Sequence, residues 1–306
     1  MVTDVGARAV PLARVVRGGV VESVHLGHLV VLAPDGSTRL ALGDPEVVVW
    51  PRSSLKPVQA TGMLEAGLDV ADEHLALVCA SHNGEPAHLD VVRAILADAG
   101  LDESALQNTP DWPLDPDAAW SARPGGPRPL TQNCSGKHAG MLATCVAAGW
   151  STDDYLAPGH PLQQHLRATT ERLTGAPVEH VTVDGCGAPL FSSTLVGLAR
   201  SFTRLDPRVV VATSGFPWFV AGTGRDATTF MQAVPGLVAK DGADGVYAAG
   251  LPDGSALAFK VLDGSSRPRP ALLAAALRAA GADPGDLGRT PVLGHGVPVG
   301  AVEPTF

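Results

Sequence analysis

The sequence predicts an α+β fold in which strands from both ends of the chain form one antiparallel sheet and the middle of the chain forms a helical lobe. Two patterns predict this arrangement. Runs of β-branched and other apolar residues separated by turn residues occupy the first 50 positions and return after position 178. Between them, apolar residues recur at helical spacing. With 306 residues, of which 45% are hydrophobic, the chain can also bury a large core.

We interpret residues 1–306 as a single domain with two lobes. The sheet lobe comprises residues 1–52 and 205–306, and the helical lobe comprises residues 53–204. A cleft is expected where the two lobes meet, and active sites are often found in such clefts.

The first half of the chain predicts strands and then helices. Strands are predicted over residues 28–33, 38–42 and 47–50, and the Pro-Asp-Gly-Ser turn at 34–37 joins the first two strands into a hairpin. Beyond them the apolar spacing becomes helical, and glycines that terminate helices help to bound the segments. We predict helices over residues 55–64, 72–79, 86–99, 137–148 and 161–174.

The other segments complete the two lobes. Residues 102–133 are rich in Pro, Gly, Asp and Trp, which indicates a long ordered excursion rather than a linker. Later in the chain we predict a helix over 192–204, a hairpin over 245–261, a helix near 270–280 and a terminal strand.

Charge and hydropathy argue against several classes of partner. Asp and Glu total 31 against 22 for Lys and Arg, so a net charge of −9 gives no overall reason to bind nucleic acid or anionic lipid. No segment approaches the roughly 20 unbroken apolar residues of a membrane span. Charged residues interrupt the first 20 positions, so no secretory signal is predicted. We therefore expect a cytoplasmic protein with a small-molecule partner.

Lysine is scarce in this chain. Only four of the 22 basic residues are lysines, namely Lys56, Lys137, Lys240 and Lys260. Under a GC-rich coding bias, surface lysines drift to arginine, and a lysine that remains is more often one that arginine cannot replace. Unlike arginine, lysine can lose its proton when it is buried beside another cation, and then act as a base or a metal ligand. For Lys260, retention by chance stays open.

Three short motifs follow one another in the order typical of serine β-lactamases and penicillin-binding proteins. They are Ser53-x-x-Lys56, Ser81-x-Asn83 and Lys240-x-Gly242. Residues three apart share a helix face, so the Lys56 amine is expected to take the proton of the Ser53 hydroxyl. We predict Ser53 as the nucleophile and Ser81 as a proton relay. Lys240 is expected to favour the neutral form of Lys56, and the motifs together refine the fold class to a serine β-lactamase/penicillin-binding-protein-like fold.

Cysteines and one arginine are further candidates, because four cysteines are too few for a disulfide framework. Cys134 and Lys137 lie three apart at a predicted helix start, Cys186 lies between glycines, and two thiolates suit zinc. By spacing alone the cysteines are first interpreted as buried structural thiols, and His138 would precede Lys137 as the third ligand. Arg225 is predicted either to clamp a substrate α-carboxylate or to lie on the surface.

Five segments of the chain resemble a known family in order and over nearly the whole length. They are Arg52–Ala60, Cys79–His82, Asn133–Leu142, Asp184–Cys186 and Lys240–Ala243. The sequence resembles the Rhizobium-type L-asparaginases, whose members are structurally related to serine β-lactamases and glutaminases. The match over residues 133–142 is long enough to be highly specific.

The resemblance implies both the chemistry and the partners of the site. It implies the catalytic pairs Ser53–Lys56 and Ser81–Lys240, a zinc ion on Cys134, Lys137 and Cys186 with water completing the shell, and substrate-contacting or ligand-supporting roles for Arg52, His138 and Asp184. A homodimer is implied as well. The zinc ion is expected to support substrate affinity or local order and not to activate the nucleophile, because two lysines already manage the protons.

The leading hypothesis is a cytoplasmic amidohydrolase that converts L-asparagine to L-aspartate and ammonia through a Ser53 acyl-enzyme. Two alternatives stay open. A penicillin-recognising acyltransferase or esterase would use the same Ser53–Lys56 pair. A zinc-stabilised amino-acid-binding protein would keep the zinc ligands without needing paired serines and lysines.

Overall fold

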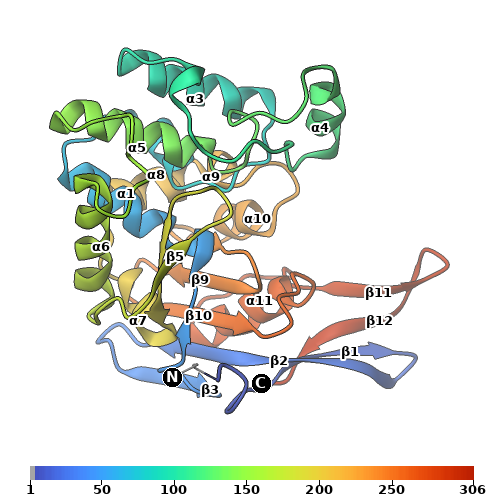
Figure 1. The fold of residues 1–306 in the computed structure, drawn as a ribbon. Helices are drawn as coiled ribbons and strands as arrows, with labels where there is room; N and C mark the ends of the chain where they lie inside the picture. The colour runs from blue at the N-terminus through green and yellow to red at the C-terminus, as the bar shows by residue number, and fades with distance from the viewer. Residues whose placement is uncertain (1–3) are drawn as a thin grey trace.

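The computed structural model describes residues 4–306, in which one curled antiparallel sheet lies beside a layer of helices (Figure 1). The sheet has eight strands in the order β11-β12-β1-β2-β10-β9-β8, with β3 paired to β2 as well. Its strands are β1 (Val10–Arg17), β2 (Val20–Leu32), β3 (Thr38–Leu42), β8 (Val238–Asp241), β9 (Val246–Gly250), β10 (Ala256–Val261), β11 (Thr290–Gly294) and β12 (Val297–Pro304). The predicted α+β fold with a sheet from both ends of the chain is confirmed.

Strand β2 joins the N-terminal and C-terminal parts of the sheet. On one side it pairs first with β1 and then with β3, and on the other side its last six residues pair with β10. Its buried half, from Leu29 to Leu32, is a continuous apolar run covered on both faces, whereas its first half is exposed. The long β2 strand therefore carries the sheet out of the core into a projecting hairpin with β1.

Two hairpins, β1–β2 and β11–β12, project side by side beyond the helices (Figure 1). Gly18 and Gly19 connect β1 to β2 with φ of 55° and 80°, and His295 and Gly296 connect β11 to β12 with φ of 49° and 81°. Two consecutive residues with positive φ form the tight turn whose twist matches a two-stranded ribbon.

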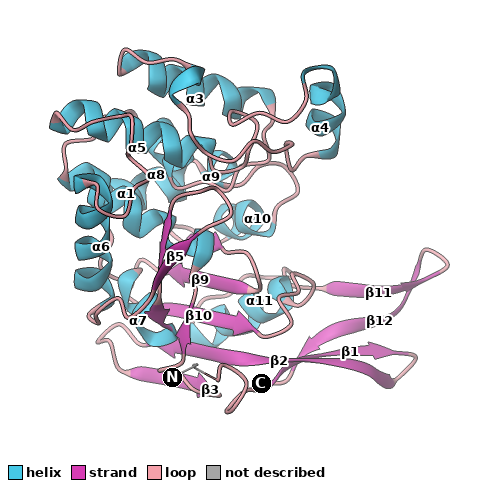
Figure 2. Cartoon of the chain, in the orientation of Figure 1, coloured by secondary structure: helices cyan, strands magenta, loops and turns pink. Residues whose placement is uncertain are grey.

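The helices lie mainly on one side of the sheet, as the cyan and magenta regions of Figure 2 show. They are α1 (Lys56–Glu65), α2 (Asp72–Val78), α3 (Pro86–Asp98), α4 (Pro116–Ala122), α5 (Ser135–Ala148), α6 (Pro161–Thr174), α7 (Leu195–Ser201), α8 (Pro207–Gly215), α9 (Pro217–Val220), α10 (Asp226–Ala233) and α11 (Arg269–Ala280). Short 3-10 turns occur at η1 (Arg52–Leu55), η2 (Glu103–Ala105) and η3 (Arg123–Gly125). Within residues 4–306, no helix combines the length and apolar character that crossing a membrane requires.

Glycines end three of the predicted helices as expected. Gly149 after α5, Gly175 after α6 and Gly281 after α11 are all left-handed, a backbone conformation that glycine adopts without a steric penalty. The helix predicted over 192–204 is shorter. Its first residues form strand β7 (Ser193–Thr194) against β4 (Val48–Val49), and α7 begins only at Leu195.

The structure differs from the predicted lobes after residue 205. Helices α8 and α9 pack against α2, so residues 207–220 lie with the helices and not with the sheet. The sheet resumes at β8. The excursion over 102–133 is ordered and contains η2, α4 and η3.

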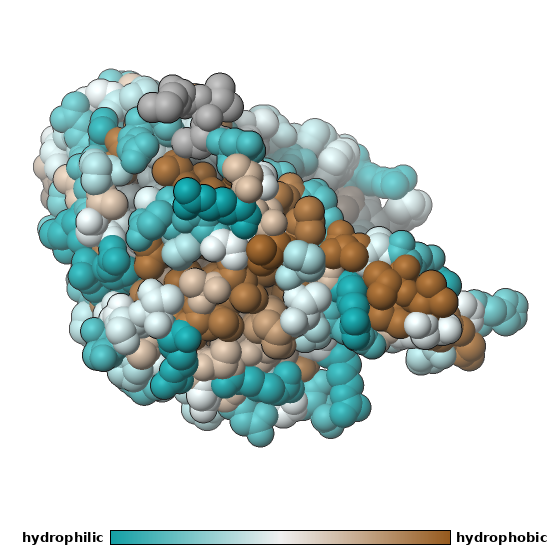
Figure 3. Space-filling model, turned by 90° about the horizontal axis from the view of Figure 1, so that it is seen from below, coloured by the Kyte–Doolittle hydropathy of each residue, from teal (hydrophilic) through white to brown (hydrophobic). Residues whose placement is uncertain are grey.

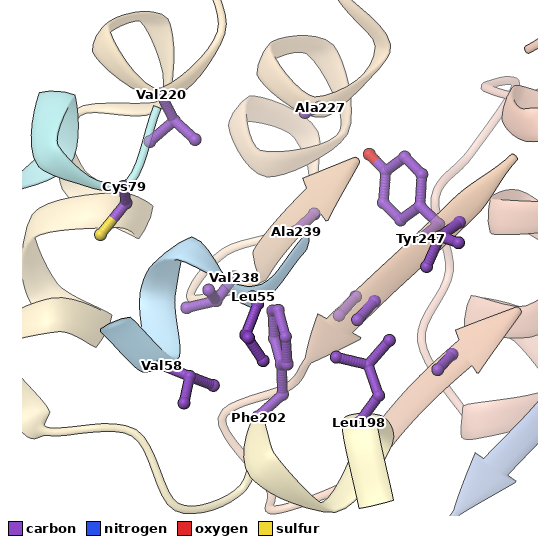
Figure 4. Packing of buried hydrophobic residues seen from close by; sticks show 14 of the residues in the cluster. Leu55, Val58, Cys79, Leu198, Phe202, Val220, Ala227, Val238, Ala239 and Tyr247 are labelled. Carbon is purple, nitrogen blue, oxygen red and sulfur yellow. The ribbon is translucent and has the colours of Figure 1, made fainter. Parts of the chain in front are cut away.

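Apolar packing fixes the segment that enters α1 against the sheet. Leu55 is 1% exposed and lies among Val238, Phe202 and Val58 (Figure 4). Full burial of a leucine side chain contributes roughly 1.5–3 kcal/mol. Turn η1 also contacts β8 and β9 directly, so Ser53 and Lys56 are carried at the junction between the helices and the sheet.

Candidate active site

Lys56 begins helix α1 and is 2% exposed. Its amine donates to Ser81 Oγ at 3.1 Å and to the Ala80 carbonyl, and it lies 3.2 Å from Cys134 Sγ. Within residues 4–306 the half-buried Ser53 hydroxyl has no hydrogen-bond partner. The structure therefore brings Lys56 to Ser81, whereas the sequence predicts a direct pair with Ser53.

Ser81 follows α2 on an extended segment that is clamped between two other parts of the chain. The Ser81 N–H donates to the Val220 carbonyl at 3.0 Å, and the His82 N–H donates to the Asn133 carbonyl at 3.1 Å. Ser81 is 6% exposed. These backbone bonds hold its hydroxyl in front of the Lys56 amine.

Lys240 lies on strand β8 and is fully buried. Its amine donates to Asp241 Oδ1 at 2.6 Å and to the Asp241 carbonyl at 2.8 Å. Burial lowers the pKa of Lys240 to about 8, with the positive charge of Lys56 acting in the same direction and Asp241 opposing both. At neutral pH the predicted second cation is thus close to losing its proton.

Asp241 is the centre of a buried charge network. Its Oδ2 accepts from Arg225 Nη2 at 2.8 Å and from Arg269 Nη1 at 3.3 Å. Burial raises the pKa of this carboxyl, but Lys240, Arg225 and Arg269 together lower it to a value below the ordinary range. Asp241 is therefore an anion that sets the positions of three cations.

Arg225 is committed to contacts inside the protein. Besides Asp241, its Nη1 donates to the Ser81 carbonyl at 3.1 Å and to Asn83 Oδ1 at 3.2 Å. The guanidinium thus ties the Ser81 segment to the Lys240–Asp241 segment. It is neither a surface group nor an open clamp for a substrate carboxylate in this arrangement.

The three predicted zinc ligands lie together. Cys134 caps the start of α5, Lys137 lies in its first turn, and Cys186 lies in the turn between β5 (Val181–Val183) and β6 (Pro189–Phe191). The Lys137 amine donates to Cys186 Sγ at 3.1 Å, and the two cysteines pack against each other, both buried.

Charge is divided unequally between the two thiols. A hydrogen bond from Cys134 lowers the pKa of Cys186 to about 4, against the effect of burial and with help from the Lys137 charge. The same contact raises the pKa of Cys134 to about 12. A thiolate, a second thiol and an amine in one buried cluster form a donor set that suits zinc.

Two further observations bear on this donor set. Among residues 4–306, no three His, Cys, Asp or Glu side chains are grouped so as to hold a metal ion, and the third polar group of this cluster is the Lys137 amine. The alternative ligand His138 donates or accepts at Nδ1 with the Tyr155 hydroxyl at 2.8 Å. Its Nε2 is buried without a partner in the described chain, and burial lowers its pKa well below the ordinary value.

Arg52 connects the Ser53 segment to two carboxylates. Its Nε donates to Asp184 Oδ1 at 2.8 Å, and its Nη1 contacts Asp244 Oδ2. Burial raises the pKa of Asp184, but the Lys137 charge and the Arg52 hydrogen bond lower it overall, so this carboxylate is ionised. Arg52 and Asp184 thus link the Ser53 segment to the turn that carries Cys186.

Comparison with known proteins identifies the family. A family model described as L-asparaginase II matches residues 13–304. The chain belongs to the L-asparaginase II family. As a member of this asparaginase family, it is an amidohydrolase with a small-molecule substrate. No curated protein matches significantly.

Solved structures show weaker likenesses to this asparaginase-family chain. A β-lactamase from Mycobacterium bovis is 15% identical over 78% of this chain and 88% of its own, with a TM-score of 0.38. Mglu in its tris and glutamate form is 13% identical over 91% of this chain and 63% of its own, with a TM-score of 0.36. A Bacillus glutaminase in the presence of 4.3 M NaCl is 12% identical over 78% and 84%, with a TM-score of 0.33. At these TM-scores we draw no argument from them.

Sequence reasoning missed two groups that join parts of the asparaginase-family site. His82 Nε2 lies 2.9 Å from Ser135 Oγ, both fully buried, and so links the Ser81 segment to the first turn of α5. Asp241 and Arg269 were missed as partners of Lys240 and Arg225. Their place in the sequence could have identified two of these residues. His82 and Asp241 occupy the variable positions of the Ser81-x-Asn83 and Lys240-x-Gly242 motifs.

Proposed function

We propose that this L-asparaginase II family member hydrolyses L-asparagine to L-aspartate and ammonia through a serine acyl-enzyme. The observation that carries the proposal is the convergence of two buried lysines on the Ser81 segment. Lys56 donates to Ser81 Oγ, and Lys240 reaches the same segment through Asp241 and Arg225. Family membership favours an amide substrate over the acyltransferase, esterase and binding-protein alternatives.

In the proposed reaction, Ser53 Oγ attacks the side-chain amide carbon of asparagine. Its hydroxyl proton passes to the Lys56 amine, and the C–N bond breaks as the leaving nitrogen takes that proton from Lys56 and departs as ammonia. Water then hydrolyses the ester, which restores Ser53 and releases L-aspartate. Ser81, which already accepts from Lys56, relays protons between Lys56 and the Lys240 network.

The geometry also supports Ser81 as the alternative nucleophile. The Lys56 amine is hydrogen-bonded to Ser81 Oγ, and the Ser53 hydroxyl has no hydrogen-bond partner among residues 4–306. We prefer Ser53 because it is half-buried and accessible, whereas Ser81 is 6% exposed and held by Lys56 from one side. Single alanine variants of the two serines decide between them.

Zinc is proposed on Cys134, Lys137 and Cys186. Bound zinc would supply a fixed positive charge that joins the start of α5 to the turn at 184–187. In the absence of the ion, the Cys186 thiolate raises the pKa of Lys137 even though burial lowers it, so ligation by the amine releases a proton. We further propose Arg52, His138 and Asp184 as substrate-contacting groups, a homodimer and a cytoplasmic location.

Ammonia release tests the proposal directly. Purified protein supplied with zinc is incubated with L-asparagine, and ammonia and L-aspartate are measured in parallel. We expect equal amounts of both products and no release by Ser53→Ala. L-glutamine serves as the comparison substrate. Failure of the wild-type protein to form L-aspartate would overturn the proposed function.

A further inference from the structure

A cavity of about 320 Å³ adjoins the segment that leads into Ser53. Trp50 and Arg52 line it on that side, and Asp244 and Lys260 line it from strands of the sheet and their connection. The cavity therefore touches the segment of the proposed nucleophile and the loop that follows the Lys240–Asp241 pair. Lys260 is also the lysine for which the sequence offers no role.

Two cations face this cavity. Lys260 is half-buried on β10, and its amine donates to the backbone carbonyl of Asp244. That carbonyl is its single acceptor within the described residues, so other N–H groups of the ammonium remain free to donate. Arg52 contributes the second positive charge, held in place by its bond to Asp184.

Asp244 contacts Nη1 of the Arg52 guanidinium, whereas Asp184 accepts from its Nε. Its side chain is 64% exposed, compared with 12% for Asp184, so water competes for this contact far more than for the Asp184 contact. Both Arg52 and Asp244 have φ of 55°, a left-handed conformation uncommon for residues other than glycine. Backbone strain of this kind clusters at ligand-binding sites, and here it presents the two side chains to each other.

We propose that this cavity binds the α-carboxylate of the substrate on Arg52 and Lys260, and that Asp244 takes its place on Arg52 when the cavity is empty. The proposal rests on the proposed function and narrows its substrate class to amides that carry a free α-carboxylate. Charge supports it: the charged residues that line the cavity are Arg52, Lys260 and Asp244, so moving the Asp244 side chain off Arg52 leaves two cations facing a bound carboxylate. Arg225 does not line this cavity, and three of its donors are engaged by Asp241, Asn83 and the Ser81 carbonyl.

Lys260→Met tests the carboxylate contact. Removing the ammonium should raise KM for L-asparagine at least about tenfold and change kcat by less than about threefold, because the group binds substrate without touching the reacting amide. Lys260→Arg should restore KM in large part. Arg289→Met, which removes an exposed ion pair with Asp286 outside the cavity, is the control and should leave both constants unchanged.

A substrate without the carboxylate sharpens this test. For 3-aminopropanamide, which is asparagine with hydrogen in place of the α-carboxylate, kcat/KM of the wild type should be low and equal to that of Lys260→Met. An equal loss in Lys260→Met for both substrates would show that Lys260 serves the structure and not the carboxylate.

Asp244→Asn tests whether Asp244 occupies Arg52 when no substrate carboxylate is bound. Asparagine tolerates the left-handed backbone but carries no charge, so Arg52 should be freed without loss of the loop conformation. KM for L-asparagine should then fall severalfold. A rise in KM would mean that Asp244 holds the substrate, and would overturn its assignment as a competitor.

Binding of L-aspartate separates the failure of this inference from failure of the proposed function. Calorimetry should give a dissociation constant at least about tenfold weaker for Lys260→Met than for the wild type. If the wild type releases no ammonia from L-asparagine, the proposed function fails. The same titration still decides whether the cavity binds a carboxylate. Equal affinity in both proteins, or no binding by the wild type, overturns the carboxylate site.

Discussion

At the scale of single residues, the structure rearranges the predicted serine–lysine pairs. The sequence correctly singles out Lys56 and Lys240 as unusual, since both are buried and one has a lowered pKa. The sequence predicts that the Lys56 amine contacts the Ser53 hydroxyl, because residues three apart share a helix face. In the structure the amine is hydrogen-bonded to Ser81 Oγ instead. Helical spacing says which residues share a face; which of two hydroxyls an amine reaches depends on the tertiary packing of the Ser81 segment.

Ser53→Ala is the first prediction at this scale. We expect kcat for L-asparagine to fall at least about 1,000-fold, because the only attacking oxygen is removed. The Ser53 hydroxyl makes no hydrogen bond within residues 4–306, so the circular dichroism spectrum and the thermal midpoint should be unchanged. If activity survives in Ser53→Ala and disappears in Ser81→Ala, then Ser81 is the nucleophile.

The pH dependence follows from Lys240. Its pKa is lowered to about 8, so below pH 8 the amine is mainly protonated and above pH 8 it is mainly neutral and able to take up a proton. We expect kcat/KM to rise with pH through an apparent pKa near 8. Lys240→Met should lower the rate and remove this limb; a profile identical to that of the wild type would exclude Lys240 from proton transfer.

At the scale of elements, the start of α5 and the turn between β5 and β6 build the cysteine cluster. Cys134 and Lys137 are brought together by helical spacing, which the sequence predicts. Cys186 joins them only because β5 and β6 place its turn beside α5, and local spacing contains no information on that contact. The family resemblance supplied it instead.

Lys137→Arg tests zinc binding by these two elements. The guanidinium keeps the positive charge beside Cys186 but cannot lose its proton to coordinate a metal, so zinc content measured by elemental analysis should fall from about one per chain to a small fraction. Cys145→Ser, a buried cysteine outside the cluster, is the control and should retain zinc. Full zinc occupancy in Lys137→Arg would make His138 the better candidate for the third ligand.

At the scale of the whole molecule, the sequence predicts the sheet better than the boundary between the lobes. A single sheet made from both ends of the chain could be predicted, because the two terminal sets of strands must pair to satisfy their backbone groups. The return of α8 and α9 onto α2 could not be predicted, because it depends on which apolar faces meet across more than 100 residues. The same long-range contact places Val220 and Ala221 where they bind the Ser81 segment.

The projecting hairpins are where we expect the proposed homodimer to form. Apolar side chains gather on the face shown in Figure 3 and continue along the projection; the exposed ones on these hairpins are Val20, Val21, Val24, Leu26, Leu293, Val297 and Val299. The ion pairs Arg14–Glu303 and Arg17–Glu22 place both signs of charge on the hairpins. A surface that carries both signs can complement a second copy of itself about a two-fold axis, so we take a second copy as the occupant.

Light scattering tests this interface. The wild type should have twice the 31.3 kDa mass of one chain, and Val24→Glu should shift it to the monomer, because a two-fold contact would bury the new carboxylate twice. Val211→Glu places the same charge on an exposed apolar position of α8, away from the hairpins, and should stay dimeric. A monomeric wild type would refute the homodimer, whereas a dimeric Val24→Glu would move the interface elsewhere on the molecule.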